Sequence, residues 1–212
     1  MNNNDEAAYR FGTEAFYAAL GRAFVAMCAV VPVLFLIEVI DRGMGQALDV
    51  AGGIRPGHLT GLDGVIFAPF LHASFAHLYG NSVPLILLGT FVLAAGTRRF
   101  LWSTGVIMLV SGLGVWFTGD RDSIVVGASG VIFGYLGLLL ARGVVDRSWW
   151  HLGVGALIGL LYGWQIIGVL PADPSVSWQG HLFGFIGGVL AAVLFRRPKG
   201  PTYLADRYLT SD

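Results

Sequence analysis

The stretch IVVGASGVIFGYLGLLLA, residues 124–141, decides the fold class of this chain. It runs for 18 residues without a charge, and about 20 apolar residues allow an α-helix to cross the roughly 30 Å hydrocarbon layer of a bilayer. Over the whole chain of 212 residues, 55% are hydrophobic and 12% are charged, whereas a soluble domain carries about 25% charged residues. We therefore expect an all-α, polytopic membrane protein.

Apolar blocks of similar length recur along the sequence and predict six transmembrane helices. Their expected ranges are 23–40, 77–96, 100–119, 124–141, 150–170 and 178–195. The segment 41–74 is too polar to span, and its short apolar run 65–71 predicts interfacial structure in a first extramembrane loop. The predicted organisation is an N-terminal segment 1–22, a transmembrane core 23–195 and a C-terminal tail 196–212.

Lys and Arg residues are distributed unevenly over the two sides of this six-span arrangement. The side that contains both termini carries ten of them, and the other side carries three, Arg42, Arg55 and Arg121. Cytoplasmic loops are enriched in Lys and Arg, so both termini are expected in the cytosol. Short loops and the absence of an organelle-type presequence favour a bacterial cytoplasmic membrane.

Four polar residues lie near the outer ends of the second, fourth and sixth spans, namely His77, Asn81, Ser129 and His181. Ionisable groups inside a bilayer are costly and usually face the bundle interior or a wet cavity with a function. Ser129 lies in Gly127-Ala128-Ser129-Gly130, where the glycines allow a tight turn around a nucleophile. A serine nucleophile needs a base within about 3 Å, and His181 is the candidate. One such residue alone is more often structural, so the cluster is what favours chemistry.

Glycine spacing predicts that the fourth and sixth spans pack closely. Small residues recur every four positions at Gly130 and Gly134 in one span, and at Gly180, Gly184 and Gly188 in the other. Such faces let helix backbones approach each other. Neither span contains Asp or Glu, so the sequence predicts a Ser-His dyad without a carboxylate.

Stabilisation of an oxyanion is the remaining requirement of a serine hydrolase. His77 and Asn81 are four residues apart and therefore share one face of the second span. Both side chains can donate hydrogen bonds, and the backbone amide of Ser129 can add another.

These motifs together resemble the rhomboid intramembrane proteases. In chain order they are His72-x4-His77-x3-Asn81, then Gly127-Ala128-Ser129-Gly130, then Gly180-His181-x2-Gly184-x3-Gly188. The resemblance covers residues 23–195 and implies six helices around a water-accessible cavity, a Ser129–His181 dyad, an oxyanion site with His77 and Asn81, and no metal or cofactor. It also implies that the substrates are transmembrane proteins, cut near the outer membrane face.

Two features depart from the family pattern. Many rhomboids carry a Trp-Arg pair in the first loop, where this chain reads Leu62-Asp63-Gly64-Val65. A tyrosine often follows the nucleophile by four residues and stacks on the catalytic histidine; Phe133 stands here and lacks the hydroxyl. Gly127 and His72 are expected to support the site, His72 through loop structure rather than chemistry.

Two other functions remain open from the residues. A catalytically inactive rhomboid-like protein would bind membrane clients, although such proteins typically lose the serine or the histidine. A small transporter would place polar groups at several depths; Glu38, near the outer end of the first span, is the only acidic residue we expect within one, and an interfacial carboxylate explains it more simply. A net charge of zero gives no indication of a nucleic-acid partner. The apolar composition implies the lipid bilayer as a partner, and the resemblance implies membrane protein substrates.

Overall fold

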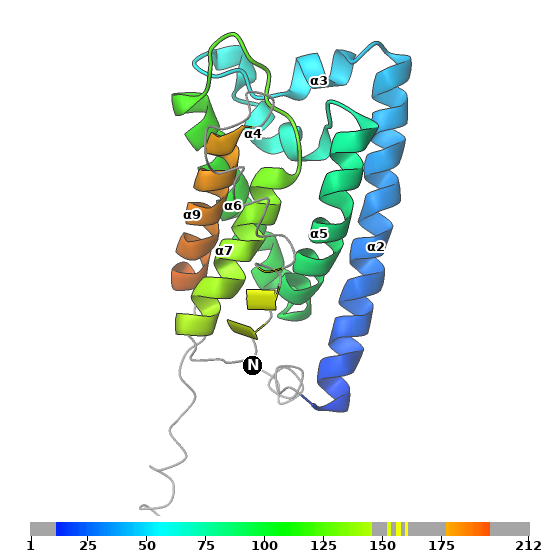
Figure 1. The fold of residues 1–212 in the computed structure, drawn as a ribbon, viewed down its shortest axis with the longest axis vertical. Coiled ribbons are helices and arrows are strands. Elements are labelled where there is room, and N and C mark those ends of the chain that lie inside the picture. The colour runs from blue at the N-terminus through cyan, green and yellow to red at the C-terminus, as the bar shows by residue number, and fades with distance from the viewer. Residues whose placement is uncertain (1–11, 146–151, 154–155, 158–159, 161–176, 196–212) are drawn as a thin grey trace, which may run out of the picture.

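The computed structural model describes residues 12–145, 152–153, 156–157, 160 and 177–195. Over these residues the chain is all-helical, and its long helices form one bundle (Figure 1). The long helices are α2 (Glu14–Gly43), α5 (Phe75–Ala94), α6 (Thr97–Thr118), α7 (Ser129–Val145) and α9 (Trp178–Leu194). The short helices α3 (Ala47–Gly52), η1 (Leu59–Gly61), α4 (Gly64–Phe67) and η2 (Ala68–Phe70) connect α2 to α5.

Length and composition divide the long helices into two groups. Helices α2, α5 and α6 are long and apolar enough to cross a membrane, while α7 and α9 are apolar helices of 17 residues each. Most of the expected fifth span, 150–170, lies outside the described residues, so the number six stays a prediction.

Hydroxyl side chains cap the two helices that carry the predicted histidines His77 and His181. The Ser74 hydroxyl oxygen accepts from the backbone N–H of His77 at 3.1 Å and caps the start of α5. The Ser177 hydroxyl oxygen accepts from the N–H of Gly180 at 3.3 Å and caps the start of α9. Such caps satisfy donors that the first helical turn leaves free, and here they fix the turns in which His77 and His181 lie.

Helix α7 begins at Ser129, five residues later than the span expected from the sequence. Val125 instead pairs with Ile54 of the first loop as an isolated antiparallel bridge, in which the N–H of each residue donates to the carbonyl oxygen of the other at 2.9 Å. This extended segment places Ser129 at the start of a helix rather than inside one.

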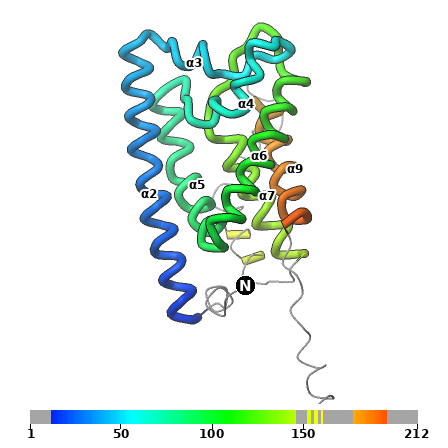
Figure 2. The backbone as a smooth tube through the Cα atoms, turned by 180° about the vertical axis from the view of Figure 1, so that it is seen from behind, coloured from blue at the N-terminus to red at the C-terminus, as the bar shows by residue number. Residues whose placement is uncertain are grey.

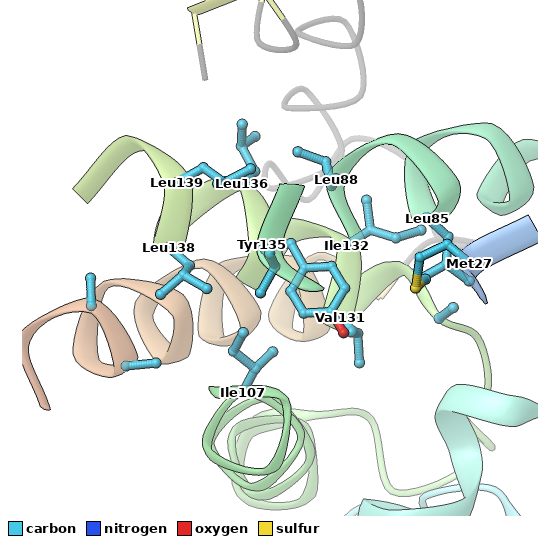
Figure 3. Packing of buried hydrophobic residues seen from close by; sticks show 14 of the residues in the cluster. Met27, Leu85, Leu88, Ile107, Val131, Ile132, Tyr135, Leu136, Leu138 and Leu139 are labelled. Atoms are coloured by element: carbon cyan, nitrogen blue, oxygen red, sulfur yellow. The ribbon is translucent and has the colours of Figure 1, made fainter. Parts of the chain in front are cut away.

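Helix α7 supplies much of the buried core. Its apolar side chains pack against Ile107 of α6, Met27 of α2, and Leu85 and Leu88 of α5 (Figure 3). Helix α2 lies along α5 at one edge of the bundle, and the short helices lie at the end where α5, α7 and α9 begin (Figures 1 and 2). The fold thus brings the predicted site residues to one covered end.

Candidate active site

The His181 side chain on α9 is 7% exposed and stacks on Phe133 of α7. The ring centroids are 4.2 Å apart and the planes differ by 11°. Phe133 lies four residues after Ser129, which is the first, half-buried residue of α7. His181 therefore stacks on the residue that lies one helical turn after Ser129, as the sequence predicted.

The backbones of α7 and α9 touch at their glycines. A Cβ on Gly184 would strike the carbonyl oxygen of Gly130, and a Cβ on Gly188 would strike that of Gly134. No larger residue fits at either position without a shift of backbone. The predicted close approach of the two helices is confirmed, and it draws together the helices that carry Ser129 and His181.

The turn before Ser129 lies against the side chains of His77 and Asn81. Gly127 has a φ of 127°, a region that favours glycine. A Cβ there would lie 2.6 Å from His77 Cε1, 2.8 Å from His77 Nε2 and 3.7 Å from Asn81 Nδ2. The Asn81 side chain is 7% exposed, and its Nδ2 has no hydrogen-bond partner within the described part of the chain. An amide donor is thus held, buried and unused, beside the turn that leads into Ser129.

His72 precedes α5 in the chain, and its side chain packs on that of His77. Its ring meets the His77 ring edge to face, with centroids 5.2 Å apart. The side chain is 2% exposed, and neither ring nitrogen has a hydrogen-bond partner among the residues described. Burial, and then the neighbouring His77, lower the pKa of His72 from its ordinary 6.5 to about 3. His72 is therefore a neutral, packed side chain at physiological pH.

The first loop organises the segment that precedes the serine. Besides the bridge from Ile54 to Val125, the N–H of Gly127 donates to the carbonyl oxygen of Ala68 at 2.9 Å. Two separate points of the loop thus hold the turn before Ser129. The loop is part of the site's scaffold rather than a mere connection.

The segment that replaces the family's Trp-Arg pair begins a short helix. The Asp63 carboxylate accepts from the N–H of Gly64 at 3.0 Å and caps α4. Val65 then packs on α6, where a Cβ added to Gly112 would lie 2.9 Å from the Val65 Cα. In this chain the segment anchors the first loop to α6.

Two polar contacts near the site escaped the sequence analysis. Ser111 of α6 is 8% exposed, and its hydroxyl donates to the carbonyl oxygen of Gly180, the residue before His181, at 2.9 Å. Glu38, expected at the interface, is 2% exposed and accepts from Arg42 Nε at 3.0 Å. The spacing of four residues between Glu38 and Arg42 was a signal for that pair. No local pattern marks Ser111, because its partner is distant in sequence.

Carboxylates gather where α2 meets α3. The Asp41 side chain accepts from the N–H of Leu48 at 2.6 Å. Burial, and then the negative charges of Asp41 and Glu38, raise the pKa of the Asp49 carboxyl to about 6. The junction therefore binds a proton more readily than isolated carboxylates do.

Over the described residues, apolar helices form a bundle with a serine and histidines gathered at one end, which is the architecture of a helical membrane protein with a polar site. A family model of the rhomboid domain matches residues 57–198, and the chain belongs to the rhomboid family. It is an integral membrane protein of a family of intramembrane proteases.

Relatives cover much of the chain. The uncharacterized protein Rv1337 of Mycobacterium tuberculosis is 44% identical over 177 residues, which are 80% of this chain and 73% of that protein. The putative rhomboid protease YdcA of Bacillus subtilis is 31% identical over 141 residues, 63% of this chain and 67% of that protein. The rhomboid protease GluP of the same organism is 32% identical over 146 residues, 63% of this chain but 26% of GluP.

Proposed function

We propose that this chain is an intramembrane serine endopeptidase with Ser129 as nucleophile and His181 as general base. The observation that carries the proposal is the contact of α7 with α9, in which the buried His181 ring stacks on Phe133, four residues after Ser129. A serine hydroxyl is a weak nucleophile without an adjacent base. Two helices in backbone contact, each with one of the two groups in its first turn, support that pairing.

The reaction that fits these residues is acyl transfer. His181 accepts the proton of Ser129 Oγ as the oxygen attacks the scissile carbonyl, and then delivers that proton to the leaving amine as the C–N bond breaks. A water molecule, deprotonated by His181, attacks the acyl-enzyme, and His181 returns the proton to Ser129 Oγ as the ester C–O bond breaks and the acid product leaves. Charge on the tetrahedral oxygen is stabilised by His77, Asn81 and the N–H of Ser129. The unused Asn81 Nδ2 beside Gly127 supports this role.

The dyad works without a carboxylate in this proposal. Helices α7 and α9 contain no Asp or Glu, so the stack on Phe133 orients the imidazole that a carboxylate would orient in a triad. His72 and Gly127 support the oxyanion side, His72 by packing on His77 and Gly127 by turning the backbone.

The proposed substrates are transmembrane proteins, cut near the outer face of a bacterial cytoplasmic membrane. The distribution of Lys and Arg supports a six-helix core, 23–195, between cytosolic segments 1–22 and 196–212. In this orientation the end of the bundle that carries Ser129 faces outward.

Cleavage of a model transmembrane substrate in proteoliposomes tests the proposal. The wild type is expected to cut it and to react with a fluorophosphonate, while Ser129→Ala and His181→Ala, folded to the same extent, do neither. Activity retained in either variant contradicts the dyad. A wild type that binds membrane clients but neither cuts nor reacts favours an inactive client-binding protein, and solute flux that depends on Glu38 but not on Ser129 favours a transporter.

A further inference from the structure

Glu38 and Arg42 form an ion pair near the end of α2 that the proposed reaction does not use. Arg42 Nε donates to Glu38 Oε1 at 3.0 Å, and the Glu38 side chain is 2% exposed. The second oxygen, Oε2, is buried without a hydrogen-bond partner among the described residues. Burying a carboxylate carries a desolvation penalty that its pairing only offsets, so such pairs contribute little net stability. A positional role explains the pair better than stability does.

Arg42 also reaches beyond its own helix. Its Nη2 donates to the carbonyl oxygen of Ala73 at 2.8 Å, and Gln46 Nε2 lies 3.3 Å from the same oxygen. Ala73 directly precedes Ser74, the residue that caps α5 through the N–H of His77. The Glu38–Arg42 pair is thus connected, through one guanidinium and one backbone carbonyl, to the start of α5.

The start of α5 carries both proposed oxyanion donors. The His77 and Asn81 side chains lie against the turn at Gly127. An oxyanion donor acts at about 2.7–3.1 Å from the developing charge, and a misplacement of about 1 Å can cost about 10²-fold in rate. Contacts that hold the first turns of α5 against Gly127 therefore control how strongly His77 and Asn81 can stabilise the oxyanion.

We propose that Glu38 and Arg42 are positioning residues for the oxyanion donors. Glu38 orients the guanidinium of Arg42, Arg42 holds the Ala73 carbonyl, and this contact sets the first turns of α5 relative to Ser129. This inference rests on the function proposed above. Both residues precede the segment 57–198 that matches the rhomboid domain, so that match assigns them no role.

The first test compares Arg42→Gln with Arg55→Gln. Arg55 is a matched control, because it lies in the first loop and its guanidinium donates to the carbonyl oxygen of Val50 rather than to Ala73. We expect Arg42→Gln to lower kcat for a transmembrane substrate about 10-fold with KM changed less than about twofold, since the interaction lost acts in the transition state. Arg55→Gln should match the wild type. Arg42→Lys, which keeps the charge but not the fork of donors, should fall between.

A second test asks whether the effect passes through the donors. In an Asn81→Ala background, Arg42→Gln should lower kcat less than about threefold, because coupled residues are not additive. The inference is overturned if Arg42→Gln lowers kcat by the same factor in the wild-type and the Asn81→Ala backgrounds. It is also overturned if Arg42→Gln has the same kcat as Arg55→Gln. If Arg42→Gln does not fold, Arg42→Lys and Glu38→Gln decide by the same comparison. An inactive wild type overturns the proposed function and this inference together, whereas an active wild type with an unaffected Arg42→Gln overturns the inference alone.

Discussion

Two buried histidines, His181 of the proposed dyad and His72 beside His77, lie in different environments. His181 stacks face to face on Phe133, so its ring has a defined plane against α7. His72 touches His77 edge to face, with both of its nitrogens unpaired among the described residues. The first environment fixes the plane of the proposed proton acceptor, while the second holds a neutral ring that packs on His77. Residue type alone does not separate these roles.

Replacing Phe133 tests whether its ring orients His181, the proposed base. Phe133→Leu keeps an apolar side chain but removes the ring stack, so His181 loses its fixed plane and we expect fluorophosphonate to react with Ser129 about 10-fold more slowly. Phe133→Tyr keeps the ring and should react at the wild-type rate. Equal labelling rates for Phe133→Leu and the wild type would show that the stack does not orient His181.

His72 predicts how stability depends on pH. Its folded-state pKa of about 3 lies below the ordinary 6.5, so between these values the unfolded chain binds a proton that the folded chain excludes. The contribution of neutral His72 to the free energy of unfolding is therefore fully present above pH 6.5. It is lost as the pH falls toward 3, by about 1.4 kcal/mol per pH unit. Unfolding in detergent from pH 7 to pH 4 measures the slope. His72→Gln should have a shallower slope than the wild type, and an unchanged slope would contradict the assignment.

At the scale of elements, the contact between α7 and α9 depends on glycine. A Cβ on Gly188 would strike the Gly134 carbonyl oxygen and lie 2.7 Å from the Leu138 nitrogen. Gly188→Ala should therefore destabilise the protein by about 1–3 kcal/mol, as overpacked sites do. The control is Gly105→Ala on α6, where an added Cβ meets nothing within 4 Å and where alanine is the better helix former. Thermal unfolding of both variants in detergent measures the difference, and equal midpoints would rule out the contact.

Hydropathy predicted the helices better than it predicted their beginnings. The expected spans 77–96 and 178–195 correspond closely to α5 and α9, because long apolar runs have few alternatives in a bilayer. The segment 124–128 is equally apolar but not helical, since Val125 pairs with Ile54 and the backbone turns at Gly127. Composition cannot distinguish these two states; only the distant partner does.

The candidate site was predictable where residue type is unusual for its surroundings. Serine and histidine inside apolar helices are conspicuous, and glycine spacing indicated which helices meet. Arg42 was conspicuous too, but its partner Ala73 contributes a backbone carbonyl, which every residue possesses. Contacts of that kind leave no mark in a sequence.

For the whole molecule, the proposed orientation can be tested with the chain's single cysteine removed. In a Cys28→Ser background, Asp122→Cys lies in the exposed loop between α6 and Ser129, the first residue of α7, and Arg98→Cys is exposed near the start of α6. We expect a membrane-impermeant maleimide to label Asp122→Cys in intact cells and Arg98→Cys only after permeabilisation. The reverse pattern would place the proposed site on the cytosolic side.

The bridge between Ile54 and Val125 and the bond from Gly127 to Ala68 also set an order of events in biosynthesis. A ribosome synthesises the first loop before the segment that leads into Ser129. Ile54 and Ala68 are therefore made before their partners Val125 and Gly127. The turn before the serine takes its shape only when these later residues pair with the loop. Until the segment before α7 is made, the first loop lacks these partners, and the proposed dyad is complete only after α9, which carries His181, has followed.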